Sequence, residues 1–140
     1  MVTVADRMST DVEPVHPDAT LIEAAQQMRT SGVGGIPVIS PEGDECAGIL
    51  TERDIVIRAL AEEREARAAV VRDVATLKPV TCSPEEDVAE VASRMQEHKV
   101  QHLPVCQAGG VVGVISLADI VFGRPDEERG TIVLPPAVSR

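Results

Sequence analysis

The stretch GILTERDIV, residues 48–56, decides the fold, because it returns 65 residues later as GVISLADIV, residues 113–121. Both stretches contain a glycine, apolar residues that favour a strand, a hydroxyl side chain and, three places further on, an aspartate. The closing Ile-Val pair also recurs. Each stretch has the pattern of a strand that leads directly into a helix. The chain is therefore predicted to contain two copies of one unit.

The repeat extends outward from these two stretches with a slightly different offset. A shift of 67 residues aligns three further pairs of segments: PDATLIEAAQQM (17–28) with PEEDVAEVASRM (84–95), IPVI (36–39) with LPVC (103–106), and VADRM (4–8) with VRDVA (71–75). The change of offset falls between the strands, where a short polar insertion in a surface turn is tolerated.

Each unit has the same predicted order of elements. Thr20 and Glu23 form a capping-box pattern at the start of a helix, which ends at the Ser-Gly pair 31–32, and Asp87 with Glu90 repeats the pattern in a weaker form. Two short apolar runs separated by turn residues follow, and an amphipathic helix from Thr51 or Ser116 closes the unit. A short strand around Val15 or Val80 completes the order β-α-β-β-α.

The predicted fold class is α/β, of the α+β type, with two such repeats. Repeat one spans residues 1–60 and repeat two spans residues 71–122. The charged, helix-favouring segment 61–70 is predicted to be a helical linker, and residues 123–140 form a C-terminal tail. A unit of this size buries little surface alone, so the repeats are expected to share one core.

Composition narrows the classes of partner. The chain has 140 residues, 44% of them hydrophobic, and a net charge of −10. This charge disfavours nucleic acids and anionic membranes, and Phe122 is the only aromatic residue on which a base could stack. Without a leader or an apolar span, a cytoplasmic protein is expected. The three cysteines lack C-x-x-C spacing, so buried reduced thiols are expected at Cys46, Cys82 and Cys106.

The duplicated junction allows two interpretations. In one, the hydroxyl and the aspartate only cap the helix. In the other, the helix N-terminus and the hydroxyl meet a phosphate while the carboxylate accepts the hydroxyls of a ribose. Aspartate reaches back to the cap less readily than glutamate, and its use in both copies favours the ligand.

The duplicated pattern, in which a Pro-Val strand, a turn and G-x-x-[ST]-x-x-D follow one another, resembles a tandem cystathionine-β-synthase (CBS) domain pair, or Bateman module. The resemblance covers residues 4–122, and TERDIVIR together with the chain length resembles the stand-alone actinobacterial type. It implies a pseudo-twofold axis, a homodimer, and two clefts that hold AMP, ADP, ATP or S-adenosylmethionine as a ligand, with no cofactor required.

The resemblance also implies residue roles. Asp54 and Asp119 would bind the ribose hydroxyls, so Asp119→Ala is expected to weaken binding. The remaining implied ligand contacts are the junction residues Thr51, Arg53 and Ser116, an apolar adenine wall of Ile36, Val38, Leu103 and Val105, and the phosphate-side residue His102. Copy one has Gly34 and Gly35 where copy two has Gln101 and His102, so one cleft is expected to dominate.

Two other functions remain open. In the first, the chain is a ligand-free module that binds a protein partner. In the second, it is a stress-related sensor that uses thiols or a metal, for which His98, His102 and Cys106 have a suggestive spacing. Pro104 interrupts the helical spacing that such a metal site needs, so no metal site is expected. No nucleophile with a base, P-loop or dinucleotide motif occurs, and no enzyme activity is predicted.

Overall fold

The computed structural model describes residues 1–123, so the predicted tail lies outside the described part of the chain except for Gly123. The first half contains these elements: α1 (Val4–Arg7), α2 (Leu21–Ser31), β1 (Gly35–Ile39), β2 (Cys46–Thr51), α3 (Glu52–Asp54) and the π-helix η1 (Ile55–Leu60). The second half contains the following: α4 (Val71–Val74), β3 (Thr76–Leu77), α5 (Val88–His98), β4 (His102–Gln107), β5 (Gly110–Ser116) and α6 (Leu117–Phe122).

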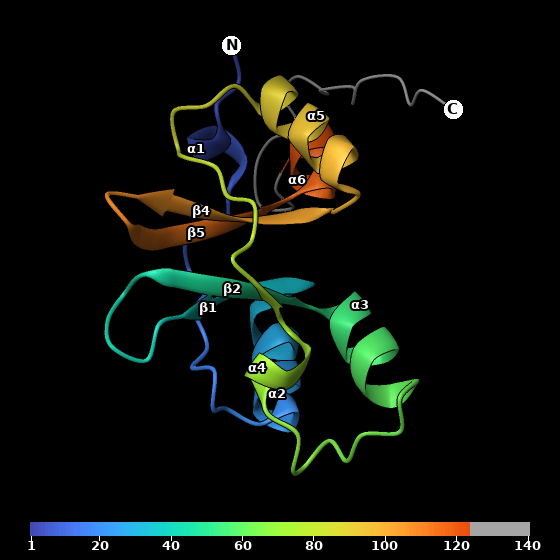
Figure 1. The fold of residues 1–140 in the computed structure, drawn as a ribbon. Coiled ribbons are helices and arrows are strands. Elements are labelled where there is room, and N and C mark those ends of the chain that lie inside the picture. Colours follow the sequence, from blue (N-terminus) through green and yellow to red (C-terminus); the bar gives the residue numbers. More distant parts are fainter. Residues whose placement is uncertain (124–140) are drawn as a thin grey trace.

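Two small antiparallel sheets meet in the middle of the molecule, and helices cover their outer faces (Figure 1). One sheet has the order β1-β2-β3 and the other consists of β4 and β5. The register shifts at Val38/Ile39 in the first sheet and at the equivalent Val105/Cys106 in the second. The duplicated α+β fold predicted from the sequence is therefore confirmed.

The short leading strand of each repeat is reduced to a single parallel bridge. Val15 pairs with Val38, and Cys82 pairs with Val105. The pairing in the second repeat is thus two residues beyond Val80, the predicted position.

Both long helices begin at their predicted capping residues, and α2 also ends at the predicted glycine. Thr20 Oγ1 accepts a hydrogen bond from the Glu23 N–H at 3.1 Å, and α2 ends at Gly32, which has a left-handed φ of 69°. At α5 the Asp87 carboxylate accepts from the Ala89 N–H at 3.0 Å. This helix ends at Lys99, which adopts the same left-handed conformation with φ 56°. A lysine thus holds a position for which glycine is better suited.

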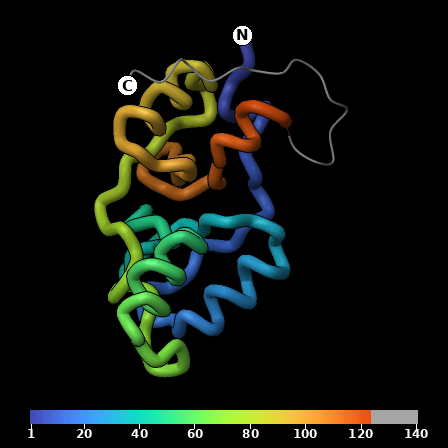
Figure 2. Tube along the Cα trace, turned by 90° about the vertical axis from the view of Figure 1, so that its right-hand side faces the viewer, coloured from blue at the N-terminus to red at the C-terminus, as the bar shows by residue number. Residues whose placement is uncertain are grey.

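The segment that leads into each repeat packs against the other repeat. The Val4 N–H donates to the Glu86 carbonyl at 2.9 Å, which places α1 at the start of α5. In the same way the Val71 N–H donates to the Ala19 carbonyl at 2.9 Å, which places α4 at the start of α2. In Figure 2 the N-terminal segment runs beside α6, near the end of the described chain. The two leading segments are therefore exchanged between the repeats.

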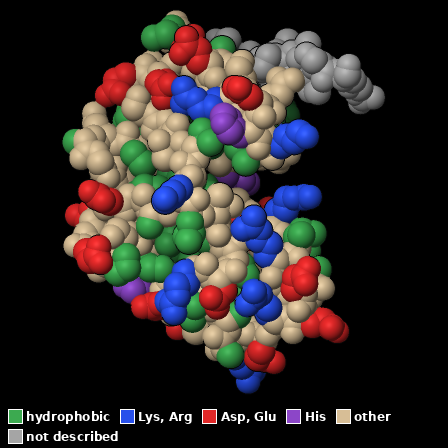
Figure 3. Space-filling view, in the orientation of Figure 1, with side chains coloured by type: hydrophobic (Ala, Val, Ile, Leu, Met, Phe, Trp, Pro, Cys, Tyr) green, Lys and Arg blue, Asp and Glu red, His purple; other side chains and the backbone are tan. Residues whose placement is uncertain are grey.

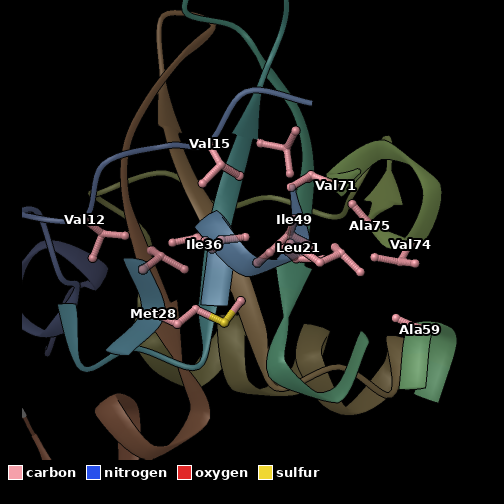
Figure 4. Packing of buried hydrophobic residues seen from close by; sticks show 14 residues of the cluster. Val12, Val15, Leu21, Met28, Ile36, Ile49, Ala59, Val71, Val74 and Ala75 are labelled. Carbon is pink, nitrogen blue, oxygen red and sulfur yellow. The ribbon is translucent and has the colours of Figure 1, made fainter. Parts of the chain in front are cut away.

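The buried apolar residues form two clusters, where the sequence predicted one shared core. The first cluster gathers α2, β1, β2 and α4 around residues such as Leu21 and Ile36 (Figure 4). The second gathers α1, α5, β4, β5 and α6 around residues such as Met95 and Ile115. Each sheet packs against its own helices on its outer face, which separates the clusters. Val114 of β5 belongs to the first cluster and connects the two halves.

The linker prediction was wrong, because residues 61–70 form turns rather than a helix. The segment is rich in alanine and charge, and most of its side chains are exposed. A short helix without an apolar face to bury gains too little to form. The preceding helix instead widens into η1, in which the Ala61 N–H donates to the Val56 carbonyl at 2.9 Å.

Across residues 1–123, every helix is too short or too polar to span a lipid bilayer.

Candidate functional site

Both duplicated junctions form helix caps. The Ser116 N–H donates to Asp119 Oδ2 at 3.0 Å, and the Asp119 N–H donates to Ser116 Oγ at 3.0 Å. In the first copy the Thr51 N–H donates to Asp54 Oδ2 at 3.0 Å. The short aspartate side chain therefore does reach back to the cap, so the sequence argument that aspartate favours a ligand was wrong. The second carboxylate oxygen of Asp54, Oδ1, lies 3.9 Å from Arg58 Nε.

Each junction lies at the edge of a separate cleft. Cleft one has a volume of about 760 Å³ and is lined by Ile49, Thr51–Asp54, Ile57, Arg58, Thr76, Lys78–Val80 and His98–Leu103. Cleft two has a volume of about 630 Å³ and is lined by Ser9, Asp11, Ser31–Gly35, Glu52, Gln101, His102, Val114 and Ser116–Asp119. Both volumes suit a small organic ligand.

The exchanged leading segments bring residues to the clefts that the repeat alignment alone does not assign there. Lys78, which follows α4, lines the cleft of Asp54. Its equivalent in the first copy, Asp11, lines the cleft of Asp119. The same pair of equivalent positions therefore supplies a cation to cleft one and an anion to cleft two.

This charge difference extends around both clefts. The lining of cleft one includes four basic side chains, Arg53, Arg58, Lys78 and Lys99, and two acidic ones, Glu52 and Asp54. The lining of cleft two includes three acidic side chains, Asp11, Glu52 and Asp119, and neither lysine nor arginine. On the side of α3, Figure 3 shows a hollow between the two halves with Lys and Arg side chains on both of its rims. Cleft one is electrostatically suited to an anion and cleft two is not.

Lys99 contributes to cleft one at a cost in backbone energy. It has a φ of 56°, and its equivalent in the first repeat is Gly32 with φ 69°. A left-handed conformation is unfavourable for residues that have a Cβ atom. Lys78, with φ 52°, is a second lysine of cleft one in this region. Backbone strain at two cleft residues is typical of a functional site.

His102 lies between the two clefts and lines both. Its ring packs against the equivalent residue Gly35, where an added Cβ would lie 2.9 Å from His102 Cγ and Cδ2. A Cβ on Gly34 would lie 2.9 Å from Glu52 Oε1. The two glycines therefore make room for side chains at the interface of the repeats. Burial lowers the pKa of His102, although the nearby carboxylates oppose this shift.

The predicted adenine wall lies mostly elsewhere. Ile36, Val38 and Val105 are fully buried in the two cores and line neither cleft. Leu103 lines cleft one although it is only 1% exposed. The apolar side of cleft one is formed instead by Ile49, Ile57, Pro79, Val80 and Val100, to which the sequence analysis assigned no ligand contact.

Of the other predicted contacts, Thr51, Arg53 and Asp54 line cleft one, and Ser116 and Asp119 line cleft two. Sequence reasoning missed Arg58, Lys78 and Lys99. The two lysines belong to the second repeat and line the same cleft as Asp54. Pairing each residue with its equivalent would have shown that Lys78 corresponds to Asp11 and Lys99 to Gly32.

The spacing of His98, His102 and Cys106 does not produce a metal cluster. The His98 ring is at the end of α5, where its Nδ1 lies 3.0 Å from the Arg94 carbonyl. Within residues 1–123, no group of three or more His, Cys, Asp or Glu side chains is placed to hold a metal ion.

Comparisons with known proteins agree on the family. The family model for the CBS domain matches residues 4–60 and 71–124. CBS domain-containing protein YhcV of Bacillus subtilis is 32% identical over 128 residues, covering 91% of this chain and 89% of that protein. Hypoxic response protein 1 of Mycobacterium tuberculosis is 32% identical over 126 residues, covering 90% of this chain and 87% of that protein.

Two solved structures show the same fold. The crystal structure of Hypoxic Response Protein I with two coordinated zinc ions has a TM-score of 0.75 and 32% identity, covering 89% of this chain and 100% of that one. A hexameric CBS-CP12 protein from bloom-forming cyanobacteria has a TM-score of 0.80 and 28% identity, covering 87% of this chain and 70% of that one.

Proposed function

This chain belongs to the CBS domain family as a tandem pair of repeats, and on that premise we propose that it is a non-catalytic sensor whose cleft one binds an adenosine phosphate. The observation that carries the proposal is the charge of cleft one, where four basic side chains surround the junction of Thr51 and Asp54. A cytoplasmic location, where adenine nucleotides are abundant, is part of the proposal.

Each part of the ligand has a matching group in cleft one. Asp54 Oδ2 is held by the Thr51 N–H, which leaves Oδ1 to accept the ribose hydroxyls. The side chain of Asp54 is 15% exposed, and Arg58 Nε lies 3.9 Å from Oδ1. The apolar residues Ile49, Val80 and Val100 offer a surface for the adenine ring. Lys78 and Lys99 supply the charge that attracts phosphate.

Cleft two is less suited to a nucleotide than cleft one. Its carboxylates, Asp11, Glu52 and Asp119, repel a phosphate, so a nucleotide favours cleft one. S-adenosylmethionine has no phosphate, and its sulfonium and ammonium groups outweigh its single carboxylate, so the basic side chains of cleft one disfavour it overall. The adenosine phosphates are therefore favoured over S-adenosylmethionine as ligands.

Binding is expected to act by shifting a conformational equilibrium. A ligand that spans cleft one contacts the junction of the first repeat and the segment 98–103 of the second. It favours whichever arrangement of the repeats brings these contacts together, to the extent of its differential affinity. A catalytic role needs an activated nucleophile or a general base, whereas a ribose-binding aspartate needs only to be ionised.

A thermal-shift panel of AMP, ADP, ATP and S-adenosylmethionine tests the proposal. A ligand at about 100 times its dissociation constant stabilises the folded protein by about 2.7 kcal/mol. We expect a clear upward shift with at least one phosphate compound and a smaller one with S-adenosylmethionine. The absence of any shift would favour the alternative of a ligand-free interaction module.

We propose further that two copies of the chain associate through the closing helices. On η1, Val56 and Leu60 are 50% and 59% exposed. Ile57 and its equivalent Phe122 on α6 are 48% and 62% exposed, so both repeats present an apolar side chain at the same position. Exposed apolar side chains of this size on neighbouring turns are typical of an interface. The hexameric assembly of the CBS-CP12 protein supports self-association of such modules.

Sedimentation analysis of wild type and two matched variants tests this association. We expect a dimer for wild type and a monomer for Leu60→Asp. Leu77→Asp is the control, because Leu77 on β3 is similarly exposed, at 54%, but lies outside the closing helices. A monomeric wild type, or equal effects of the two variants, would contradict the assigned surface.

A further inference from the structure

The two sheets touch at the end opposite cleft one, and two cysteines meet there. Glu45, next to the start of β2, forms an antiparallel bridge with Gly110 at the start of β5. The Val111 N–H donates to the Asp44 carbonyl at 3.3 Å. Cys46 directly follows Glu45, and Cys106 on β4 is paired with Val111 across the second sheet. The fold therefore brings Cys46 of one repeat beside Cys106 of the other.

The two thiols are close enough for each to shift the pKa of the other, and both residues are partly exposed. The Cys46 thiol donates to the Gly48 carbonyl, with Sγ 3.5 Å from the oxygen. Cys82 is different, since it is only 4% exposed and its thiol lies 3.8 Å from the Pro104 carbonyl. Of the three cysteines, Cys46 and Cys106 are thus the two that are both adjacent and partly accessible.

We propose that Cys46 and Cys106 form a reversible disulfide bond that ties the two repeats together when a low-molecular-weight disulfide oxidises the protein. β2 runs from Cys46 to the junction at Thr51, and β4 runs from His102 to the region of Cys106. The bond therefore joins the ends of these strands that are remote from cleft one. It fixes the distance between β2 of the first repeat and β4 of the second.

The reaction is a pair of thiol–disulfide exchanges. The Cys106 thiolate attacks one sulfur of the small disulfide, and one small thiol leaves with a proton. The Cys46 thiolate then attacks the Cys106 sulfur of the mixed disulfide and displaces the second small thiol. Two protein S–H bonds are lost and one S–S bond forms, while the small disulfide gains two electrons and two protons.

The order of attack follows from the environment of the thiols. Burial, together with the neighbouring Cys106 thiol, raises the pKa of Cys46 to about 12. Burial also raises the pKa of Cys106, but the neighbouring Cys46 thiol opposes this shift. Cys106 is therefore the first to ionise. Both thiols are protonated near neutral pH, so oxidation is expected to be slower than at an exposed cysteine.

The test is oxidation of the full chain with oxidised glutathione, followed by intact-mass measurement and peptide mapping without reduction. We expect the loss of two hydrogens, a linked pair of peptides containing Cys46 and Cys106, and a free Cys82. Cys82→Ser should form the same link. Cys106→Ser and Cys46→Ser should each form only a mixed disulfide with glutathione.

A second readout is thermal unfolding, which does not depend on any bound nucleotide. Oxidised wild type should melt at a higher temperature than reduced protein, and dithiothreitol should reverse the shift, because the bond closes a long loop. A link that involves Cys82, a link between two chains, or stable glutathione adducts on both Cys46 and Cys106 of wild type would each overturn the proposal.

Discussion

Replacement of Lys99 by glycine should raise stability and lower nucleotide affinity at the same time. Lys99 has a left-handed φ of 56°, and this conformation costs a residue with a Cβ atom about 1 to 2 kcal/mol. The greater freedom of glycine in the unfolded chain offsets about 0.5 to 1 kcal/mol. The free energy of unfolding should therefore rise by about 0.5 to 1 kcal/mol, which urea unfolding can detect.

The affinity for ADP should fall because cleft one loses an exposed cation. A solvent-exposed ionic contact contributes up to about 1 kcal/mol, which is about a fivefold change in the dissociation constant. Lys99→Met separates the two effects, since it removes the charge but keeps the left-handed Cβ. It should weaken ADP binding to the same extent without raising stability.

Gly32→Ala is the matched control in the first repeat. Gly32 has φ 69°, and an added Cβ would meet no atom within 4 Å, so only the backbone conformation opposes the substitution. It should lower stability by about 0.5 to 1 kcal/mol, the mirror of the gain at Lys99. A Lys99→Gly variant with unchanged stability and unchanged ADP affinity would refute the assignment of Lys99 as a strained ligand-binding residue.

Two further predictions concern the fold. Gly35→Ala should destabilise the protein by about 1 to 3 kcal/mol, because its Cβ would lie 2.9 Å from the His102 ring. Urea unfolding should show that His102→Ala in the same chain recovers most of this loss, whereas purely additive effects would argue against the contact. The Arg94 guanidinium donates a hydrogen bond to the Glu86 carboxylate, which lowers the pKa of Glu86. The stability that this pair gives the folded protein is therefore fully present above the ordinary pKa of 4.5 and is lost as the pH falls through the lowered pKa. Glu86→Gln should therefore lower stability by about 1 kcal/mol at pH 7 and by less at pH 3, and an equal loss at both pH values would contradict this.

The duplication and most of the elements could be predicted from sequence because their signals are local. Thr20 caps α2 and Gly32 ends it through contacts within a few residues. The linker at 61–70 was mispredicted because helix propensity says nothing of whether a face is buried. Local patterns also gave no sign that the leading segments would be exchanged between repeats, since that depends on contacts such as Val4 with Glu86.

The composition of the clefts depended on this exchange. The junction residues Thr51 and Asp54 could be identified because each lies within the repeated motif. Lys78 lines the cleft of Asp54 because the second leading segment packs on the first repeat. The sequence correctly indicated that the two clefts differ. It assigned His102 to a cleft of the second copy alone, whereas this residue lines both clefts. The aspartate whose loss should weaken nucleotide binding is therefore Asp54, where the sequence analysis chose Asp119 for the test.

The most direct test of the central claim is calorimetric titration of ADP into wild type, Asp54→Ala and Asp119→Ala. Loss of a charge-assisted hydrogen-bond pair to ribose costs about 2 to 3 kcal/mol, so Asp54→Ala should weaken binding about 30- to 150-fold. Asp119→Ala should bind ADP as tightly as wild type, because the lining of cleft two contains neither lysine nor arginine. The opposite result, in which Asp119→Ala loses affinity and Asp54→Ala retains it, would contradict the assignment of the nucleotide to cleft one.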